Sequence, residues 1–124
     1  MKKTIYIAKP TKSHLRLINK TDSDCLKVNN DFIKYGKSHD IEKRIKDYKK
    51  DNDGDVEMYG VVDCDHFTDE QLRNLETAVG RRVRDYRQSN PGKKGNSLLE
   101  WCKGLEEEVL KKVIQEEFDK ITAK

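Results

Sequence analysis

Residues 32–48 constrain the fold of this chain most strongly, because they join a short strand to a helix through a glycine turn. The extended part, residues 31–35, carries aromatic and β-branched side chains and leads into Gly36. The helix that follows places Arg44 and Tyr48 on one face, since they are four residues apart. A guanidinium held beside a glycine turn is well suited to clamp a phosphate group, so this segment is the first candidate for chemistry.

The remaining elements follow from hydrophobic periodicity. Residues 4–8 and 56–64 have strand patterns, and residues 11–30 are polar with a weak alternation that predicts a hairpin or an ordered insertion. Asp40 can cap a helix that runs to about residue 50. A capping box beginning at Thr68 opens a second helix, expected to end near residue 89, and a last helix is expected from about residue 105.

The predicted order is strand, insertion, strand, helix, strand, helix, helix. This order predicts an α/β or α+β fold with a small three-stranded sheet flanked by helices. At 124 residues the chain is expected to form one domain over residues 1–101, interrupted by the 11–30 insertion. Residues 102–124 are expected to form a C-terminal helix packed on that domain.

Charge is abundant and unevenly placed. Charged residues make up 40% of the chain and hydrophobic residues 34%, with a mean hydropathy of −1.00, yet the apolar residues are periodic, which argues against disorder. Residues 1–50 carry a net charge of +8 and residues 51–100 a net charge of −4. The basic half indicates a polyanionic partner, although a Lys-rich solvated surface explains it equally well.

The three cysteines do not form a recognisable site. Cys25, Cys64 and Cys102 are odd in number and widely spaced, which favours buried thiols in a reducing cytosol over a disulfide framework. A zinc site from Cys64, His66 and Cys102 lacks the usual CxxC spacing. The apolar run near the N-terminus is too short for a signal segment, and no run has membrane-spanning length, so a cytoplasmic location is expected.

Taken in order, several motifs resemble the GIY-YIG nuclease superfamily, in the style of its small phage and viral members. Thr4-Ile5-Tyr6 stands at the position of GIY, and Lys34-Tyr35-Gly36 stands at the position of YIG. Arg44 follows Gly36 by eight residues, and Glu76 lies in a later helix, with Asn96 in the loop beyond it. The sequence departs from the pattern at Thr4, Lys34 and Tyr48, where a glycine, a tyrosine and often a histidine are found.

This resemblance implies a metal-dependent endonuclease that hydrolyses phosphodiester bonds in DNA, with RNA as an alternative substrate. The implied catalytic residues are Tyr6, Tyr35, Arg44, Tyr48 and Glu76. Glu76 would hold Mg²⁺ or Mn²⁺, and Arg44 would donate to the phosphate oxygens. Tyr6 would relay the proton from water if its pKa were lowered by nearby cations, and Tyr35 or Tyr48 would orient that water.

Other polar residues are expected to bind the substrate. They are Lys34, Gly36 and Lys37 at the turn, Arg81 and Arg84 in the most basic helix segment, and Lys93, Lys94 and Asn96 in the following loop. Taken singly, each has a simpler interpretation as a solvated or capping residue.

Two other functions fit the same pattern. One is a nucleic-acid-binding module on the same fold that has lost catalysis, which the missing YIG tyrosine favours. The other is a small viral inhibitor that uses the acidic C-terminal helix as an interaction face. The pairing of two copies is left open by the sequence.

Overall fold

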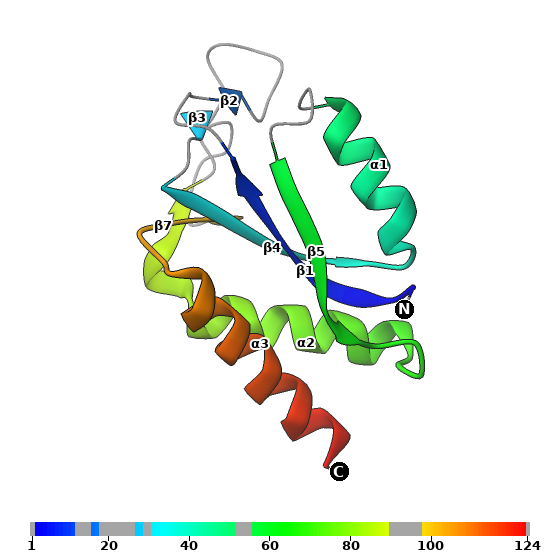
Figure 1. Cartoon of the computed structure of the whole chain (residues 1–124). Helices are drawn as coiled ribbons and strands as arrows, with labels where there is room; N and C mark the ends of the chain where they lie inside the picture. Colours follow the sequence, from blue (N-terminus) through cyan, green and yellow to red (C-terminus); the bar gives the residue numbers. More distant parts are fainter. Residues whose placement is uncertain are drawn as a thin grey trace.

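The computed structural model describes residues 2–11, 16–17, 27–28, 31–51, 56–89 and 98–123. Helix α1 lies on one face of an antiparallel sheet and helices α2 and α3 lie on the other (Figure 1). The five strands of this sheet have the order β5-β1-β4-β7-β6. The elements are β1 Thr4–Pro10, β4 Phe32–Ser38, α1 Ile41–Asp51, β5 Val56–Asp63, α2 Asp69–Arg82, the 3-10 helix η1 Arg84–Tyr86, β6 Arg87–Ser89, β7 Leu98–Lys103 and α3 Glu107–Thr122.

The α+β class is confirmed, but the prediction of three strands in the sheet is wrong. Strands β6 and β7 were not anticipated, because Arg87–Ser89 is short and polar and Leu98–Lys103 has no regular alternation. Their strand conformation comes from pairing, since β7 binds β4 on one side and β6 on the other. The prediction that α2 extends to about residue 89 is also wrong, since the helix ends at Arg82.

The 11–30 segment contains a short antiparallel ladder between β2 (Arg16–Leu17) and β3 (Lys27–Val28). This pairing agrees with the hairpin interpretation of the segment. The predicted first helix is confirmed at Ile41–Asp51, and the Lys43 amide donates to the Asp40 side chain as expected of a cap.

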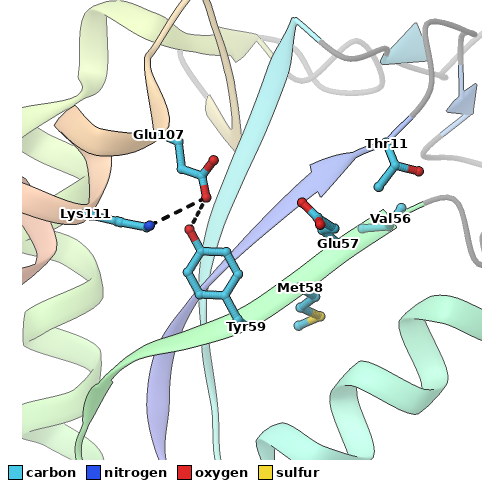
Figure 2. A pocket seen from close by; sticks show the side chains of 7 residues that line it. All are labelled: Thr11, Val56, Glu57, Met58, Tyr59, Glu107 and Lys111. Atoms are coloured by element: carbon cyan, nitrogen blue, oxygen red, sulfur yellow. Dashed lines mark hydrogen bonds and ion pairs between the residues drawn. The ribbon is translucent and has the colours of Figure 1, made fainter.

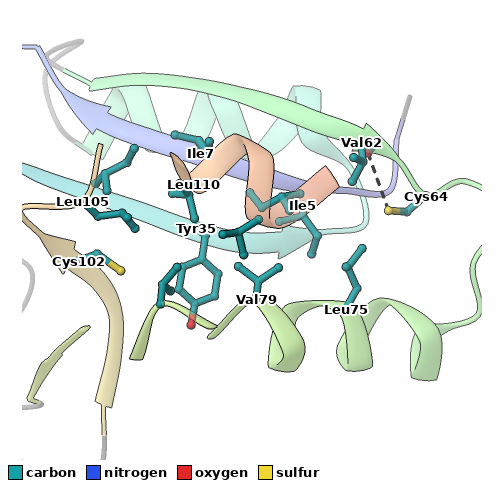
Figure 3. Packing of buried hydrophobic residues seen from close by; sticks show 14 of the residues in the cluster. Ile5, Ile7, Tyr35, Val62, Cys64, Leu75, Val79, Cys102, Leu105 and Leu110 are labelled. Carbon is teal, nitrogen blue, oxygen red and sulfur yellow. Dashed lines mark hydrogen bonds between the residues drawn. The ribbon is translucent and has the colours of Figure 1, made fainter. Parts of the chain in front are cut away.

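The face covered by α2 and α3 holds the main hydrophobic core. Directly opposed residues of antiparallel strands share a face, and Ile7 of β1 opposes Tyr35 of β4. Both belong to a cluster of 16 buried residues that draws on the sheet, α2 and α3 (Figure 3). Its fully buried members include Leu72, Leu75, Val79, Leu110 and Ile114. This cluster supplies most of the apolar burial that stabilises the fold.

The face covered by α1 holds a smaller cluster. It contains Tyr6, Ala8, Ile41, Val56 and Met58, with Ile45 packed against it. Because Tyr6 opposes Gly36 and Ala8 opposes Lys34, the side chains at positions 34 and 36 belong to this same face.

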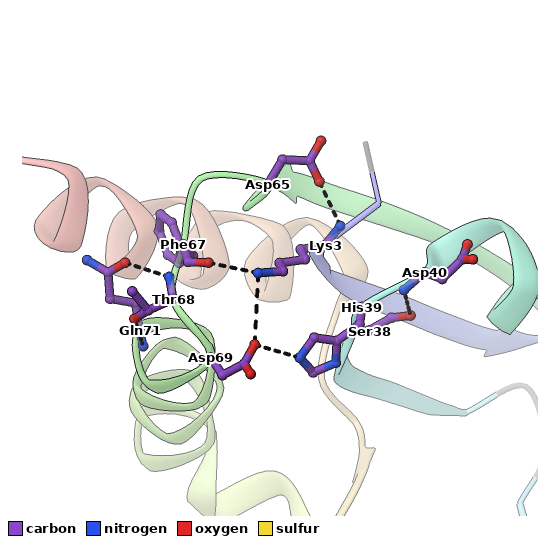
Figure 4. A network of polar contacts seen from close by, with 9 residues as sticks. All are labelled: Lys3, Ser38, His39, Asp40, Asp65, Phe67, Thr68, Asp69 and Gln71. Carbon is purple, nitrogen blue, oxygen red and sulfur yellow. Dashed lines mark hydrogen bonds and ion pairs between the residues drawn. The ribbon is translucent and has the colours of Figure 1, made fainter.

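A polar network fixes the start of α2 against the end of β4 (Figure 4). The predicted capping box is present, with the Gln71 amide donating to Thr68 Oγ1 at 3.1 Å and the Thr68 amide donating to Gln71 Oε1 at 2.8 Å. Asp69 lies 3.0 Å from His39 Nε2 and 3.9 Å from Lys3 Nζ. The network therefore sets the position of α2 relative to the turn after β4.

Helix α3 packs on α2 through both polar and apolar contacts. Arg82 Nη1 donates to Glu116 at 2.8 Å and to Glu117 at 3.3 Å, and the Phe67 and Phe118 rings stack with centroids 5.4 Å apart. Within α3, Val109 is 45% exposed, whereas its neighbour Leu110 is fully buried.

Two of the three cysteines can be located, and both are buried free thiols, as expected; Cys25 lies outside the described residues. In the described part of the chain, no helix is long and apolar enough to cross a membrane.

Candidate active site at the open half of β4

The candidate site lies where β7 separates from β4. The register joins β7 only to Phe32, Ile33 and Lys34 of β4, so residues 35–38 have no strand partner on that edge within the described chain. The Lys37 amide on this open edge donates instead to Glu76 Oε2 of α2 at 2.9 Å. A helix residue therefore takes the place that a strand would occupy.

Glu76 is held in a defined orientation at this edge. Besides the amide contact, Lys37 Nζ donates to Glu76 Oε1 at 3.3 Å, and the Glu76 side chain is only 16% exposed. Two donors from one residue thus hold the two carboxylate oxygens. A carboxylate whose orientation is fixed by a backbone N–H is suited to act as a ligand without further ordering.

The opposite face of the same strand brings together Tyr6, Gly36 and Arg44. A Cβ atom at Gly36 would stand 2.5 Å from the Tyr6 hydroxyl oxygen, so only glycine lets the phenol lie across β4. Arg44 of α1 forms a side-chain hydrogen bond with Tyr6. The sequence grouping of tyrosine, glycine and arginine therefore corresponds to a spatial grouping.

Burial acts against ionisation of the Tyr6 phenol. Tyr6 is 1% exposed, and burial raises the pKa of its phenol. The Arg44 hydrogen bond and charge act in the opposite direction, while the charges of Glu100 and Glu76 add to the increase. The lowered pKa on which the expected proton relay depends is therefore contradicted, because burial outweighs the nearby cation.

Lys34 lies beside Tyr6 on this face. It opposes Ala8 of β1 and Trp101 of β7, and its Nζ stands 5.8 Å from the centroid of the Trp101 ring. Burial lowers the pKa of the Lys34 amine; the Arg44 charge acts in the same direction, and the charges of Glu100 and Glu76 oppose it.

Glu100 was missed by sequence reasoning. It lies on β7 next to Trp101, just beyond the last residue of β7 that pairs with β4. Burial and the neighbouring Glu76 charge raise the pKa of the Glu100 carboxyl, and the Lys34, Lys37 and Arg87 charges lower it. The signal was a single acid within the run Leu98–Lys103, where Glu100 is half-buried.

Arg87 supports the same region from β6. Its Nε donates to the Leu99 carbonyl at 2.8 Å and its Nη2 donates to the Leu98 carbonyl at 3.0 Å. Its guanidinium also lies 5.9 Å from the centroid of the Tyr35 ring. Arg87 therefore fixes the strand residues that precede Glu100.

Of the two tyrosines expected to orient the water, only the Tyr35 side chain is placed by the structure. Tyr35 is 1% exposed in the main core, and a Cβ at Gly80 would stand 2.6 Å from its hydroxyl oxygen. Burial raises its pKa, whereas Arg87 lowers it. Tyr48 lies in α1, four residues after Arg44, and its side chain lies outside the described part of the structure.

The predicted substrate-binding residues are only partly located. Arg81, near the end of α2, and Arg84, in η1, are exposed. Lys93, Lys94 and Asn96 lie outside the described residues.

The residues near Glu76 can be compared with what a divalent cation requires. No group of three His, Cys, Asp or Glu side chains is gathered among the described residues. Glu76 has Glu100 near enough for their charges to interact. One or two carboxylates, completed by waters and substrate phosphates, is the usual protein contribution to a Mg²⁺ site, so the donor set fits this ion.

A pocket of about 480 Å³ lies elsewhere, between the outer edge of β5 and the start of α3 (Figure 2). Tyr59 donates a hydrogen bond to Glu107, and Lys111 Nζ stands 5.2 Å from the Tyr59 ring centroid. None of its lining residues belongs to the group around β4, so this pocket is separate from the candidate active site.

Comparison with known protein families gives one match, over residues 4–117. A family model described as the T5orf172 domain matches this range, which spans the sheet, α1, α2 and most of α3. This domain is found in phage proteins and is associated with nuclease-related folds. No curated protein and no solved structure matches the chain. Because the match covers more than half of the sequence, this chain belongs to the T5orf172 domain family.

Proposed function

We propose that this protein is a metal-dependent endonuclease of the GIY-YIG type that hydrolyses phosphodiester bonds in DNA. The observation that carries the proposal is the convergence at the open half of β4. There Tyr6 and Lys34 on one face of the sheet interact electrostatically with Arg44 and with the Glu76 and Glu100 carboxylates. The family match to a domain of phage proteins associated with nuclease-related folds supports the same class.

We assign separate roles in this reaction to Arg44, Tyr6 and Lys37. Arg44, exposed on α1 and hydrogen-bonded to Tyr6, would donate to the phosphate oxygens as negative charge builds on them. Tyr6 would hold the guanidinium in place. Lys37 would keep the Glu76 carboxylate turned toward the phosphate through its amide contact.

Glu76 would hold Mg²⁺ or Mn²⁺, with Glu100 as the neighbouring carboxylate. When bound, such an ion would supply Lewis-acid stabilisation of the phosphoryl oxygens and of the leaving oxygen. The exposed Arg81 and Arg84 would contact the DNA backbone, and that binding would weaken steeply with salt.

The test is cleavage of supercoiled plasmid and of single-stranded DNA by the purified protein, with Mg²⁺ or Mn²⁺ against EDTA. We expect metal-dependent nicking that falls by about a hundredfold or more in Glu76→Gln and in Arg44→Ala, as for the loss of a charge-stabilising group. Glu70→Gln, an exposed glutamate in the first turn of the same helix, is the matched control and should keep full activity. Activity that survives in Glu76→Gln would contradict the assignment of this site.

A second candidate, a DNA-binding module without catalysis, is favoured by one observation. Lys37 Nζ already contacts the carboxylate that would hold the ion. Salt-sensitive DNA binding with no cleavage in either metal, by a protein shown to be folded, would establish this alternative.

A further inference from the structure

Resting on the proposed nuclease function, we infer that the Lys37 side chain competes with the divalent cation for the Glu76 carboxylate and so sets the metal concentration at which the enzyme becomes active. Lys37 contacts this carboxylate twice. Its amide donates to Glu76 Oε2 at 2.9 Å, and its Nζ donates to Glu76 Oε1 at 3.3 Å. One contact belongs to the backbone and the other to a flexible side chain, so the second can be broken while the first remains.

The amide contact is fixed by the strand. Lys37 opposes Ile5 of β1 in the antiparallel ladder, and within the described chain the other edge of β4 has no strand partner at this position. The Lys37 N–H reaches Glu76 across that open edge. Because a backbone N–H away from water needs an acceptor, the amide retains Glu76 as its partner whatever the lysine side chain does.

The ammonium contact is the weaker of the two. Its length of 3.3 Å exceeds the separation of about 2.7–2.9 Å that is usual when an ammonium donates to a carboxylate. The Lys37 side chain is 36% exposed, whereas the Glu76 side chain is 16% exposed. An ion pair with one partner this exposed contributes little to stability, and a lysine side chain gains rotamer freedom when it is released. The ammonium can therefore leave at little cost to the fold.

The Glu76 carboxylate is a poor host for two cations at once. A divalent ion such as Mg²⁺ contacts a carboxylate oxygen at about 2.0–2.1 Å, so an ammonium bonded to the same carboxylate would stand close to it. Their repulsion is strong where solvent is partly excluded, as it is around Glu76. The Lys37 charge also acts on Glu100, so departure of the ammonium increases the attraction of both carboxylates for a divalent ion.

The deciding variant is Lys37→Met, which keeps the amide and an unbranched side chain but removes the charge. We expect Mn²⁺ to bind this variant about tenfold more tightly than the wild type, the lower end of the range by which groups beside a metal ligand change affinity. Isothermal titration calorimetry with Mn²⁺ and no DNA measures the affinity, so the result does not depend on activity.

Two further variants separate competition for Glu76 from other effects of the substitution. Lys37→Arg keeps a positive charge beside Glu76, so its Mn²⁺ affinity should stay near the wild-type value. Lys112→Met removes a charge from an exposed position on α3 and should also bind Mn²⁺ as the wild type does. Glu76→Gln should abolish the binding that Lys37→Met strengthens.

A second measurement uses the wild-type protein and does not require Lys37→Met to fold. The NMR signal of the Lys37 ammonium can be assigned by its absence in Lys37→Arg. Ion-paired ammonium protons exchange slowly with water, so addition of Mg²⁺ should speed this exchange as the ammonium leaves Glu76. Exchange that stays unchanged at a Mg²⁺ concentration that saturates Glu76 would overturn the competition.

The outcomes distinguish this inference from the proposed function. Equal or weaker Mn²⁺ binding in Lys37→Met, with binding still abolished by Glu76→Gln, would overturn the competition and leave the metal site and the nuclease function intact. Binding that is insensitive to Glu76→Gln would overturn both the site assignment and the competition. A wild-type protein and a Lys37→Met variant that neither bind Mn²⁺ nor cleave DNA would overturn the proposed function together with this inference.

Discussion

The two faces of the sheet use the same strands for different purposes. On the face covered by α2 and α3, 16 buried residues form a continuous core in which Tyr35 is enclosed. On the face covered by α1, the buried cluster has five residues, and charged groups such as Lys34 and Arg44 lie at its margin. Because side chains alternate along β4, adjacent residues serve stability and chemistry separately.

The largest expected effect belongs to the main core. Leu110→Ala removes a fully buried side chain between α3 and the sheet and should lower the free energy of unfolding by about 2–5 kcal/mol. The neighbouring Val109 is 45% exposed, so Val109→Ala should change it by less than about 0.5 kcal/mol. Urea denaturation of both variants measures the difference, and equal losses would show that α3 is not packed in this register.

A pair of glycine substitutions tests the two faces directly. Gly36→Ala places a methyl group 2.5 Å from the Tyr6 hydroxyl oxygen, and Gly80→Ala places one 2.6 Å from the Tyr35 hydroxyl oxygen. Each should lower the free energy of unfolding by about 1–3 kcal/mol through overpacking.

Only Gly36→Ala should also disturb the contact between Tyr6 and Arg44 and thus weaken DNA cleavage by more than its effect on stability predicts. Cleavage rates measured well below each variant's melting temperature are the comparison to make. Equal losses of activity would mean that the two faces are not functionally separate.

A smaller effect is expected at the start of α2. Thr68→Ala removes the side-chain acceptor of the capping box and should cost about 1 kcal/mol of folding free energy. Thr77→Ala, an exposed position within the same helix, is the control. Thermal unfolding measures both, and a cost at Thr77 as large as at Thr68 would show that helix propensity, rather than the cap, is responsible.

The smallest effect concerns pH and Glu100. Since its pKa is raised in the folded protein, the carboxyl favours folding fully below its ordinary pKa of 4.5, and this contribution is lost as pH rises through the folded pKa. Glu100→Gln does not titrate, so it should gain stability relative to the wild type between pH 4 and pH 8. Urea midpoints at the two pH values measure this, with exposed Glu57→Gln as the control. A gain of the same size in Glu57→Gln would remove the case for a buried carboxylate.

The local elements were accessible from the sequence because each depends on residues close together in the chain. The β1 and β4 patterns, the Asp40 cap and the Thr68 capping box predicted β1, β4, α1 and the start of α2. The proximity of Tyr6, Gly36 and Arg44 followed from the family resemblance. Strands β6 and β7 could not be predicted in this way, because pairing with β4 rather than local propensity gives them their conformation.

The sequence by itself determined the α+β class, the order of the main elements and the family to which the chain belongs. Only the tertiary structure decided that β7 leaves half of β4 open, that Glu76 fills that edge, and that Glu100 joins it. It also decided that burial shifts two pKa values in opposite directions, raising that of the Tyr6 phenol and lowering that of the Lys34 amine. Residue identity sets the ordinary pKa of a side chain, but burial and neighbouring charge depend on contacts between distant segments.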